Sequence, residues 1–111
     1  MTAPLHVVNT AVGSDKDART LASLIIEARL AACVQCLPIH SLYRWKGRVE
    51  SAREILLLAK TRSTCVKPLM VFIRKHHPYK LPEILATPVS QALPAYRQWV
   101  MTETRFRTSQ P

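Results

Sequence analysis

The 111-residue sequence contains no apolar run that approaches the roughly 20 residues needed to cross a bilayer. It has no low-complexity segment and no internal repeat beyond an echo between its two halves. Residues 1–13 lack the basic start and the long apolar stretch of a secretory signal peptide. These absences argue against a membrane-spanning chain, so we expect no membrane partner and a cytoplasmic location.

The sequence contains only three cysteines, an odd number: Cys33, Cys36 and Cys65. In a chain long enough to fold without covalent staples, an odd count favours free thiols over a disulfide framework. Cys33 and Cys36 have the spacing of a redox or metal motif. They fall in a predicted strand, however, where residues three apart face opposite sides. The sequence therefore favours two separate thiols over a functional pair.

Acidic residues are few, because seven Asp and Glu against sixteen Lys and Arg give a formal net charge of +9. This excess makes an acidic partner such as nucleic acid worth testing. The basic residues are scattered, and the one dense group is Arg74, Lys75, His76 and His77, followed by Lys80. Scattered charge is typical of a solvated surface. We therefore expect nucleic-acid binding to be absent or non-specific.

The length suffices for one domain with a real core and is too short for two. Apolar patterning predicts a strand over residues 5–11 and then a helix that ends near Ala31. Ser14 and Asp17 have capping-box spacing at the start of that helix. Two strands follow, over about 33–45 and 49–60, joined by a turn at Lys46 and Gly47. Pro38 fits the first of these strands only at a bulge or a sheet edge.

Prolines set the bounds of the second half of the chain. A helix begins around residues 63–65, because Pro68 is tolerated only in the first turn, and it ends near His76, because Pro78 disfavours helical backbone before it. A short strand over 82–88 and a last helix from Pro94 follow. The order is the α+β, ferredoxin-like split βαβ sandwich with an added C-terminal helix. We expect one domain over residues 1–111, with a core over about 5–104 and a loose tail over 105–111.

Several short segments, in one order and with similar gaps, resemble a single family. They are Arg29-Leu30-Ala31-Ala32-Cys33, Tyr43-Arg44-Trp45-Lys46-Gly47, Lys60-Thr61-Arg62, His77-Pro78-Tyr79, Pro82-Glu83-Ile84 and Pro88-Val89, followed by Tyr96 and Trp99. The family is the CutA divalent-cation tolerance family, and the resemblance covers roughly residues 7–103. It implies a ferredoxin-like subunit in a tight homotrimer, similar in architecture to the PII signalling proteins. It also implies tolerance to copper and other divalent cations, with no established catalytic reaction.

The resemblance further implies a metal site made by adjacent histidines near the end of the second helix and a cysteine on the first strand. His76 and His77 match the histidine pair, whereas Asn9 stands at the cysteine position and is a weaker ligand for a soft or borderline metal. Successive residues in extended backbone also point apart. We therefore expect weak binding of Cu(II) or another divalent cation, and no organic cofactor. Histidines at a helix C-terminus are alternatively explained as cations that the helix dipole stabilises.

A group of aromatic and charged residues is predicted near the subunit boundary. Its members are Tyr43, Trp45, Lys60, Tyr79 and Glu83. They would line an inter-subunit cleft, where concave sites commonly form, although interface packing explains the aromatic residues equally well. No convincing pair of acidic residues for general acid-base catalysis is evident, so we expect a protein that is not an enzyme.

Two other functions compete with metal response. The first is a trimeric interaction or signalling scaffold without metal, which the sequence does not separate from a metal sensor. The second is a non-specific RNA-binding module, because the same split βαβ plan underlies RRM domains. The strand over residues 55–60 argues against it, because it offers aliphatic side chains where RRM domains carry stacking aromatics.

Overall fold

The computed structural model describes residues 4–105. Its elements are β1 (Leu5–Val12), α1 (Asp15–Glu27), β2 (Cys33–Trp45), β3 (Arg48–Arg62), the short 3-10 helix η1 (Ser63–Cys65), α2 (Val66–His76), β4 (Ile84–Val89) and α3 (Pro94–Glu103). The predicted element order is confirmed, including the start of α2 beside Pro68 and the start of α3 at Pro94. Among these helices, none combines the length and the apolar character needed to cross a membrane.

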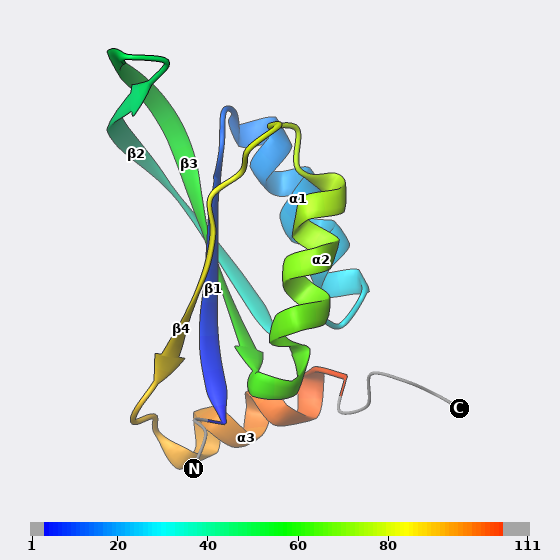
Figure 1. The fold of residues 1–111 in the computed structure, drawn as a ribbon. Helices are drawn as coiled ribbons and strands as arrows, with labels where there is room; N and C mark the ends of the chain where they lie inside the picture. Colours follow the sequence, from blue (N-terminus) through cyan, green and yellow to red (C-terminus); the bar gives the residue numbers. More distant parts are fainter. Residues whose placement is uncertain (1–3, 106–111) are drawn as a thin grey trace.

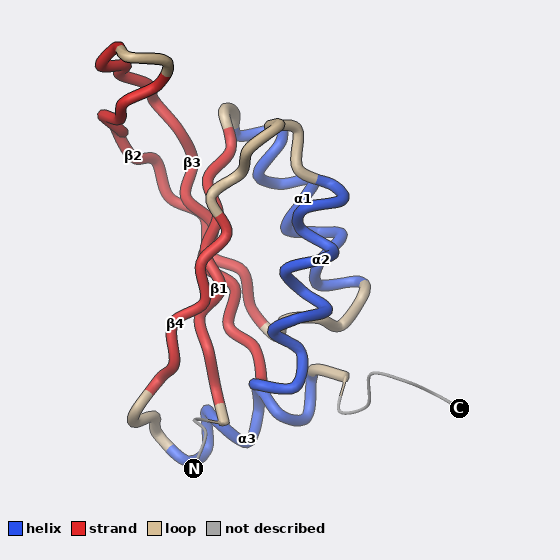
Figure 2. Tube along the Cα trace, in the orientation of Figure 1, coloured by secondary structure: helices blue, strands red, loops and turns tan. Residues whose placement is uncertain are grey.

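The four strands form one antiparallel sheet in the order β2-β3-β1-β4. Helices α1 and α2 both lie on one side of this sheet (Figures 1 and 2). This is the ferredoxin-like arrangement that the sequence predicts. Strand alternation sends every second residue of β1 and β3 toward the helices. There they form the core, whose fully buried members include Val8, Val12, Leu57, Ile25, Leu69 and Ile73.

Helix α1 begins at the predicted cap and ends earlier than predicted. The Ser14 hydroxyl accepts a hydrogen bond from the Asp17 N–H at 3.1 Å. The helix ends at Glu27 because Arg29 has a left-handed backbone, with φ of 59°. The N–H groups of Arg29 and Leu30 then donate to the carbonyls of Ile26 and Ile25. These two bonds form a Schellman motif, which closes the helix without glycine.

The C-terminal part of the described chain docks on this turn. The Arg29 side chain donates to the Thr102 carbonyl at 2.9 Å and the Glu103 carbonyl at 3.2 Å. The Arg105 N–H donates to the Arg29 carbonyl at 2.9 Å, and Thr104 is fully buried. Arg105, the first residue of the predicted loose tail, is thus hydrogen-bonded to the turn after α1. Residues 106–111 of that tail lie outside the described residues.

Strands β2 and β3 continue past the body of the protein as a two-stranded arm (Figure 1). Their register runs from Cys33 opposite Lys60 to Trp45 opposite Arg48. At the tip, Lys46 and Gly47 have φ of 50° and 77°. Two left-handed residues in a two-residue loop are the conformation that fits the twist of a hairpin. The turn predicted at these residues is therefore confirmed, and it fixes which side chains of the arm share a face.

Candidate functional site

The two histidines at the end of α2 lie in different surroundings. The His77 ring is buried, its Nε2 lies 2.8 Å from the Ala11 carbonyl oxygen, and its Nδ1 lies 3.1 Å from the Tyr79 backbone nitrogen. A carbonyl can only accept and an N–H can only donate, so Nε2 carries the proton and Nδ1 is the acceptor. Both ring nitrogens of His77 are thus engaged in holding the segment after α2.

Burial lowers the pKa of His77 below its ordinary value, and the hydrogen bond to Ala11 and the nearby Glu54 and Asp17 only partly oppose this effect. The helix-dipole explanation of a cationic pair therefore does not apply to this residue. His76, in contrast, is exposed, and its ring centroid lies 4.4 Å from that of Phe72. The neutral ring of His77 serves structure, and the ring of His76 is the accessible imidazole.

Asn9 is also engaged, since its Nδ2 donates to Glu83 Oε2 at 2.7 Å on the face of the sheet that α1 and α2 leave free. His77 has other partners, since its ring is hydrogen-bonded to the backbone of Ala11 and Tyr79. Among residues 4–105, no three His, Cys, Asp or Glu side chains gather as a group able to hold a metal ion. The residues present therefore do not fit a metal centre built within one subunit.

Four of the five residues predicted for the cleft come together around one cavity of about 860 Å³. They are Tyr43, Trp45, Tyr79 and Glu83, and Glu54, His40 and Lys80 also line it. Lys60 is not among the lining residues. Its Nζ donates to the Gln35 side chain farther along the sheet. Four of the five predicted residues thus line this cavity within one subunit, and Lys60 does not.

The cavity is built where the arm leaves the body and the segment after α2 passes over the end of β1. Tyr43 and Trp45 are two apart on β2, so both side chains point to the same face of the arm. Tyr79 Oη donates to Glu54 Oε2 at 2.8 Å. A Cβ at Gly13 would lie 3.3 Å from that hydroxyl, so the absence of a side chain there lets the Tyr79 ring come close.

Glu54 lines the cavity, although it was not among the residues predicted for the cleft. Its carboxylate meets Tyr79 because β3 pairs with β1 as far as Ile55 opposite Val12, which brings Glu54 to the end of β1. Burial, followed by the hydrogen bond to Glu54, raises the pKa of Tyr79 to about 12. The phenol therefore keeps its proton at neutral pH and serves as a fixed donor.

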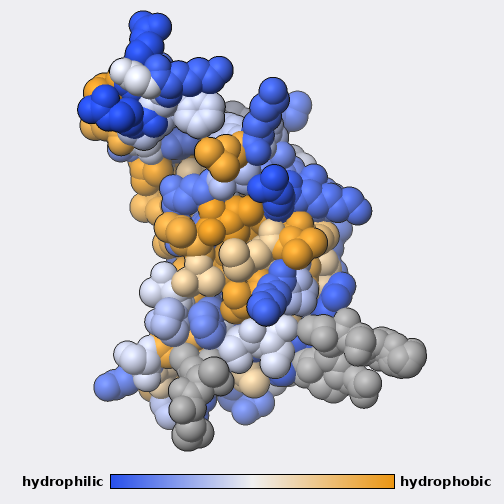
Figure 3. All heavy atoms as spheres, viewed as in Figure 1, coloured by the Kyte–Doolittle hydropathy of each residue, from blue (hydrophilic) through white to orange (hydrophobic). Residues whose placement is uncertain are grey.

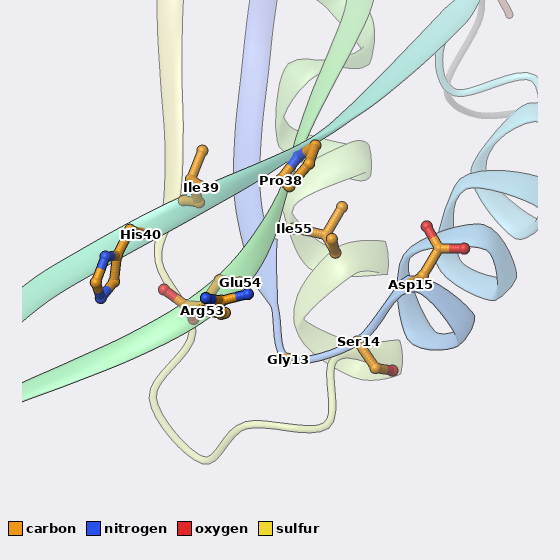
Figure 4. Close-up of a pocket in the computed structure, with 9 residues that line it drawn as sticks. All are labelled: Gly13, Ser14, Asp15, Pro38, Ile39, His40, Arg53, Glu54 and Ile55. Atoms are coloured by element: carbon orange, nitrogen blue, oxygen red, sulfur yellow. The ribbon is translucent and has the colours of Figure 1, made fainter.

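A second cavity, of about 520 Å³, lies between the start of α1 and the base of the arm. Figure 4 shows Ser14 and Asp15 on one side of it and His40 on the other. The His40 ring forms a 2.7 Å hydrogen bond with the Ser51 hydroxyl. Asp15 and His40 thus lie apart, on different sides of this cavity.

The three cysteines do not form a site either. Cys33 pairs opposite Lys60 and Cys36 opposite Leu57, so their side chains leave opposite faces of β2, as predicted. Cys65 is fully buried and its Sγ lies 3.0 Å from the Arg105 carbonyl oxygen. Burial raises the pKa of Cys65. All three are free thiols in separate surroundings.

Comparison with known proteins identifies close relatives of this chain. A sequence profile described as CutA1 divalent ion tolerance protein matches residues 6–103. Protein CutA of Mus musculus is 44% identical over 88 residues, which are 78% of this chain and 50% of the mouse protein. The divalent-cation tolerance protein CutA of Thermus thermophilus is 40% identical over 100 residues, which are 89% of this chain and 97% of that protein. The chain thus spans about half the length of its mouse relative and nearly all of the bacterial one.

Solved structures agree with the sequence match. The crystal structure of CutA from Xylella fastidiosa superposes with a TM-score of 0.90 at 36% identity, covering 93% of this chain and 100% of that chain. The structure of the periplasmic divalent cation tolerance protein CutA of Archaeoglobus fulgidus superposes with a TM-score of 0.87 at 29% identity, covering 89% and 97%. The ferredoxin-like architecture is therefore shared along nearly the whole described chain.

Proposed function

The chain belongs to the CutA1 divalent ion tolerance family, and from this premise we propose that it is a homotrimeric metal-response protein. It binds divalent cations weakly, Cu(II) foremost, and catalyses no reaction of its own. The observation that carries the proposal is the match over residues 6–103, together with near-complete coverage of a relative named for divalent-cation tolerance. We keep the cytoplasm as its proposed compartment.

The face of the sheet that α1 and α2 leave free, called here the helix-free face, supports self-assembly. Leu37 is 41% exposed and Leu85 is 56% exposed, and the half-buried Leu56 and Leu58 belong to the same face by register. In the view of Figure 3, hydrophobic residues also gather over the middle of the molecule, where β4 and α2 lie, and the arm carries the exposed Leu42 and Val49. A contiguous apolar surface of this kind is typical of an interaction site. The outer strands β2 and β4 further offer free edges for pairing between subunits.

Light scattering tests this assembly directly, since a trimer has three times the mass of the 12.6 kDa chain. Leu85→Glu places a charge on the helix-free face and should shift the protein toward smaller species. Val71→Glu is the matched control, because Val71 is 70% exposed on α2, away from that face. A wild-type monomer at micromolar concentration would refute the proposed assembly.

The metal contact is assigned to His76. Its ring is exposed, whereas both nitrogens of His77 and the amide of Asn9 are already hydrogen-bonded. Imidazole favours copper, which also stands highest in the divalent series. A single imidazole beside the exposed Arg74 and Lys75 gives only modest affinity, and protonation of the ring abolishes it.

Calorimetry with Cu(II) and Zn(II) tests this assignment on three proteins. His76→Ala should lose most of the copper binding, and His77→Gln should retain it. Equal copper affinity in the wild type and in His76→Ala would show that the assignment is wrong. The second candidate function, a trimeric signalling scaffold without metal, would then be preferred, because the engagement of His77 and Asn9 already favours it.

A further inference from the structure

The large cavity combines two carboxylates with three aromatic rings. Glu54 and Glu83 both line it, and each accepts a hydrogen bond from a neutral donor, Tyr79 Oη and Asn9 Nδ2 respectively. Neither forms an ion pair with a described residue, since the ion pair found in residues 4–105 joins Arg19 and Asp15. Neutral donors fix the two carboxylates in place without cancelling their charge.

In a single subunit, the aromatic side chains of the cavity are accessible. Tyr43, Trp45 and Tyr79 are 46%, 43% and 39% exposed, respectively. The first two are held by the pleat of β2, and the third by its hydrogen bond to Glu54. The negative faces of such rings attract organic cations, and Trp attracts them more strongly than Tyr. The cavity therefore offers two kinds of attraction to one class of ligand.

We propose that this cavity is a binding site for a small organic ammonium ion, with the rings packing on its alkyl groups and Glu54 and Glu83 balancing its charge. The volume of about 860 Å³ lies within the range of small-molecule sites. A hard metal ion would need six or more oxygen ligands and would gain nothing from the rings. An anion would be repelled by the carboxylates, and a neutral ligand would leave their charge unbalanced.

Lys80 and His40 are the other titratable residues of the lining. Lys80 is exposed, and its ammonium group competes with a cationic ligand through like charge. Lys80→Ala should therefore strengthen binding of an organic cation. His76 is not among the lining residues, so this inference goes beyond the proposed metal response and does not depend on it.

Tetramethylammonium chloride is the probe, and the two tryptophans of the chain are the reporters. Trp45 lines the cavity, whereas Trp99 lies in α3 beside Tyr96. Two-dimensional NMR of the intact protein follows the two indole N–H signals, which a Trp99→Phe variant assigns. Tetramethylammonium should shift the Trp45 signal in a saturable way and leave that of Trp99 in place. Sodium chloride at equal ionic strength should leave both signals in place. So should tert-butanol, an uncharged molecule of similar size.

Glu54→Gln and Glu83→Gln remove the charges while keeping an acceptor for Tyr79 and Asn9. Each should weaken tetramethylammonium binding by about tenfold, a change that corresponds to roughly 1.4 kcal/mol. Glu27→Gln is the matched control, because it removes the same charge from an exposed position on α1 outside the cavity. The variant His76→Ala should bind tetramethylammonium like the wild type, which separates this inference from the copper assignment. An unchanged affinity in both cavity variants, or an equal response to tert-butanol, would overturn the inference.

Discussion

Replacing His77 tests how the segment after α2 is held. His77→Ala removes two hydrogen bonds and leaves the Ala11 carbonyl and the Tyr79 N–H without these partners. A hydrogen bond contributes about 0.5–1.5 kcal/mol net, so the two together are worth about 1–3 kcal/mol. For a chain of this size, a loss of about 2 kcal/mol lowers the melting temperature by about 9 °C.

The effect of this substitution depends on pH with a definite sign. The pKa of His77 is lowered from 6.5 in the folded protein, so the unfolded chain binds the proton more tightly. The stabilisation is therefore complete above pH 6.5 and is lost as the pH falls below 6.5 toward the folded pKa. At its steepest, one proton changes the free energy of unfolding by about 1.4 kcal/mol per pH unit.

Urea denaturation of the wild type and of His77→Ala at pH 8 and pH 5 measures both effects. The protein concentration must be equal throughout, because assembly makes apparent stability depend on it. The difference in unfolding free energy should be larger at pH 8 than at pH 5. His77→Gln, which cannot be protonated, should have a shallower dependence than the wild type. A difference that is the same at both pH values would refute the argument.

Three other outcomes are expected. Gly47→Ala should lower the free energy of unfolding by about 1 kcal/mol, measured by urea denaturation, because φ of 77° strains a residue with a side chain. Arg29→Gly, which keeps the left-handed turn but removes the bonds to α3, should speed amide exchange in α3 with little change in α1. With a thiol reagent at pH 8, exposed Cys36 should react and buried Cys65 should stay unreactive until urea unfolds the protein; a Cys65 that reacts as fast as Cys36 would contradict the packing of η1.

Local signals in the sequence predict most of the fold. Ser14 marks the start of α1, and Pro68 and Pro78 delimit α2, because each residue restricts the backbone within one turn of itself. The early end of α1 has no such signal, because Arg29 adopts a conformation that glycine usually provides. The hydrogen bonds of Arg105 could not be predicted either, because its partners Ala28 and Arg29 are distant in sequence.

The site required information that only the assembled sheet supplies. His76 and His77 are alike in sequence, and tertiary packing alone buries one ring and exposes the other. Tyr43 and Trp45 share one face of β2, because strand alternation relates residues two apart. The distinct positions of Glu54 and Lys60 depend on the pairing register between β1 and β3, which one sequence does not fix.

The place of β1 in the sheet has a consequence for biosynthesis. This strand is made before the other three, yet it lies between β3 and β4, which are made much later. A ribosome-bound chain cannot pair Leu5–Val12 with β3 until residues 55–62 have emerged, nor close its other edge until residues 84–89 follow. During that interval an apolar strand has unpaired backbone groups, which makes the nascent chain prone to aggregation. Completion of the sheet must therefore wait until β4 has emerged from the ribosome, and chaperones that shelter β1 should raise the yield of this protein.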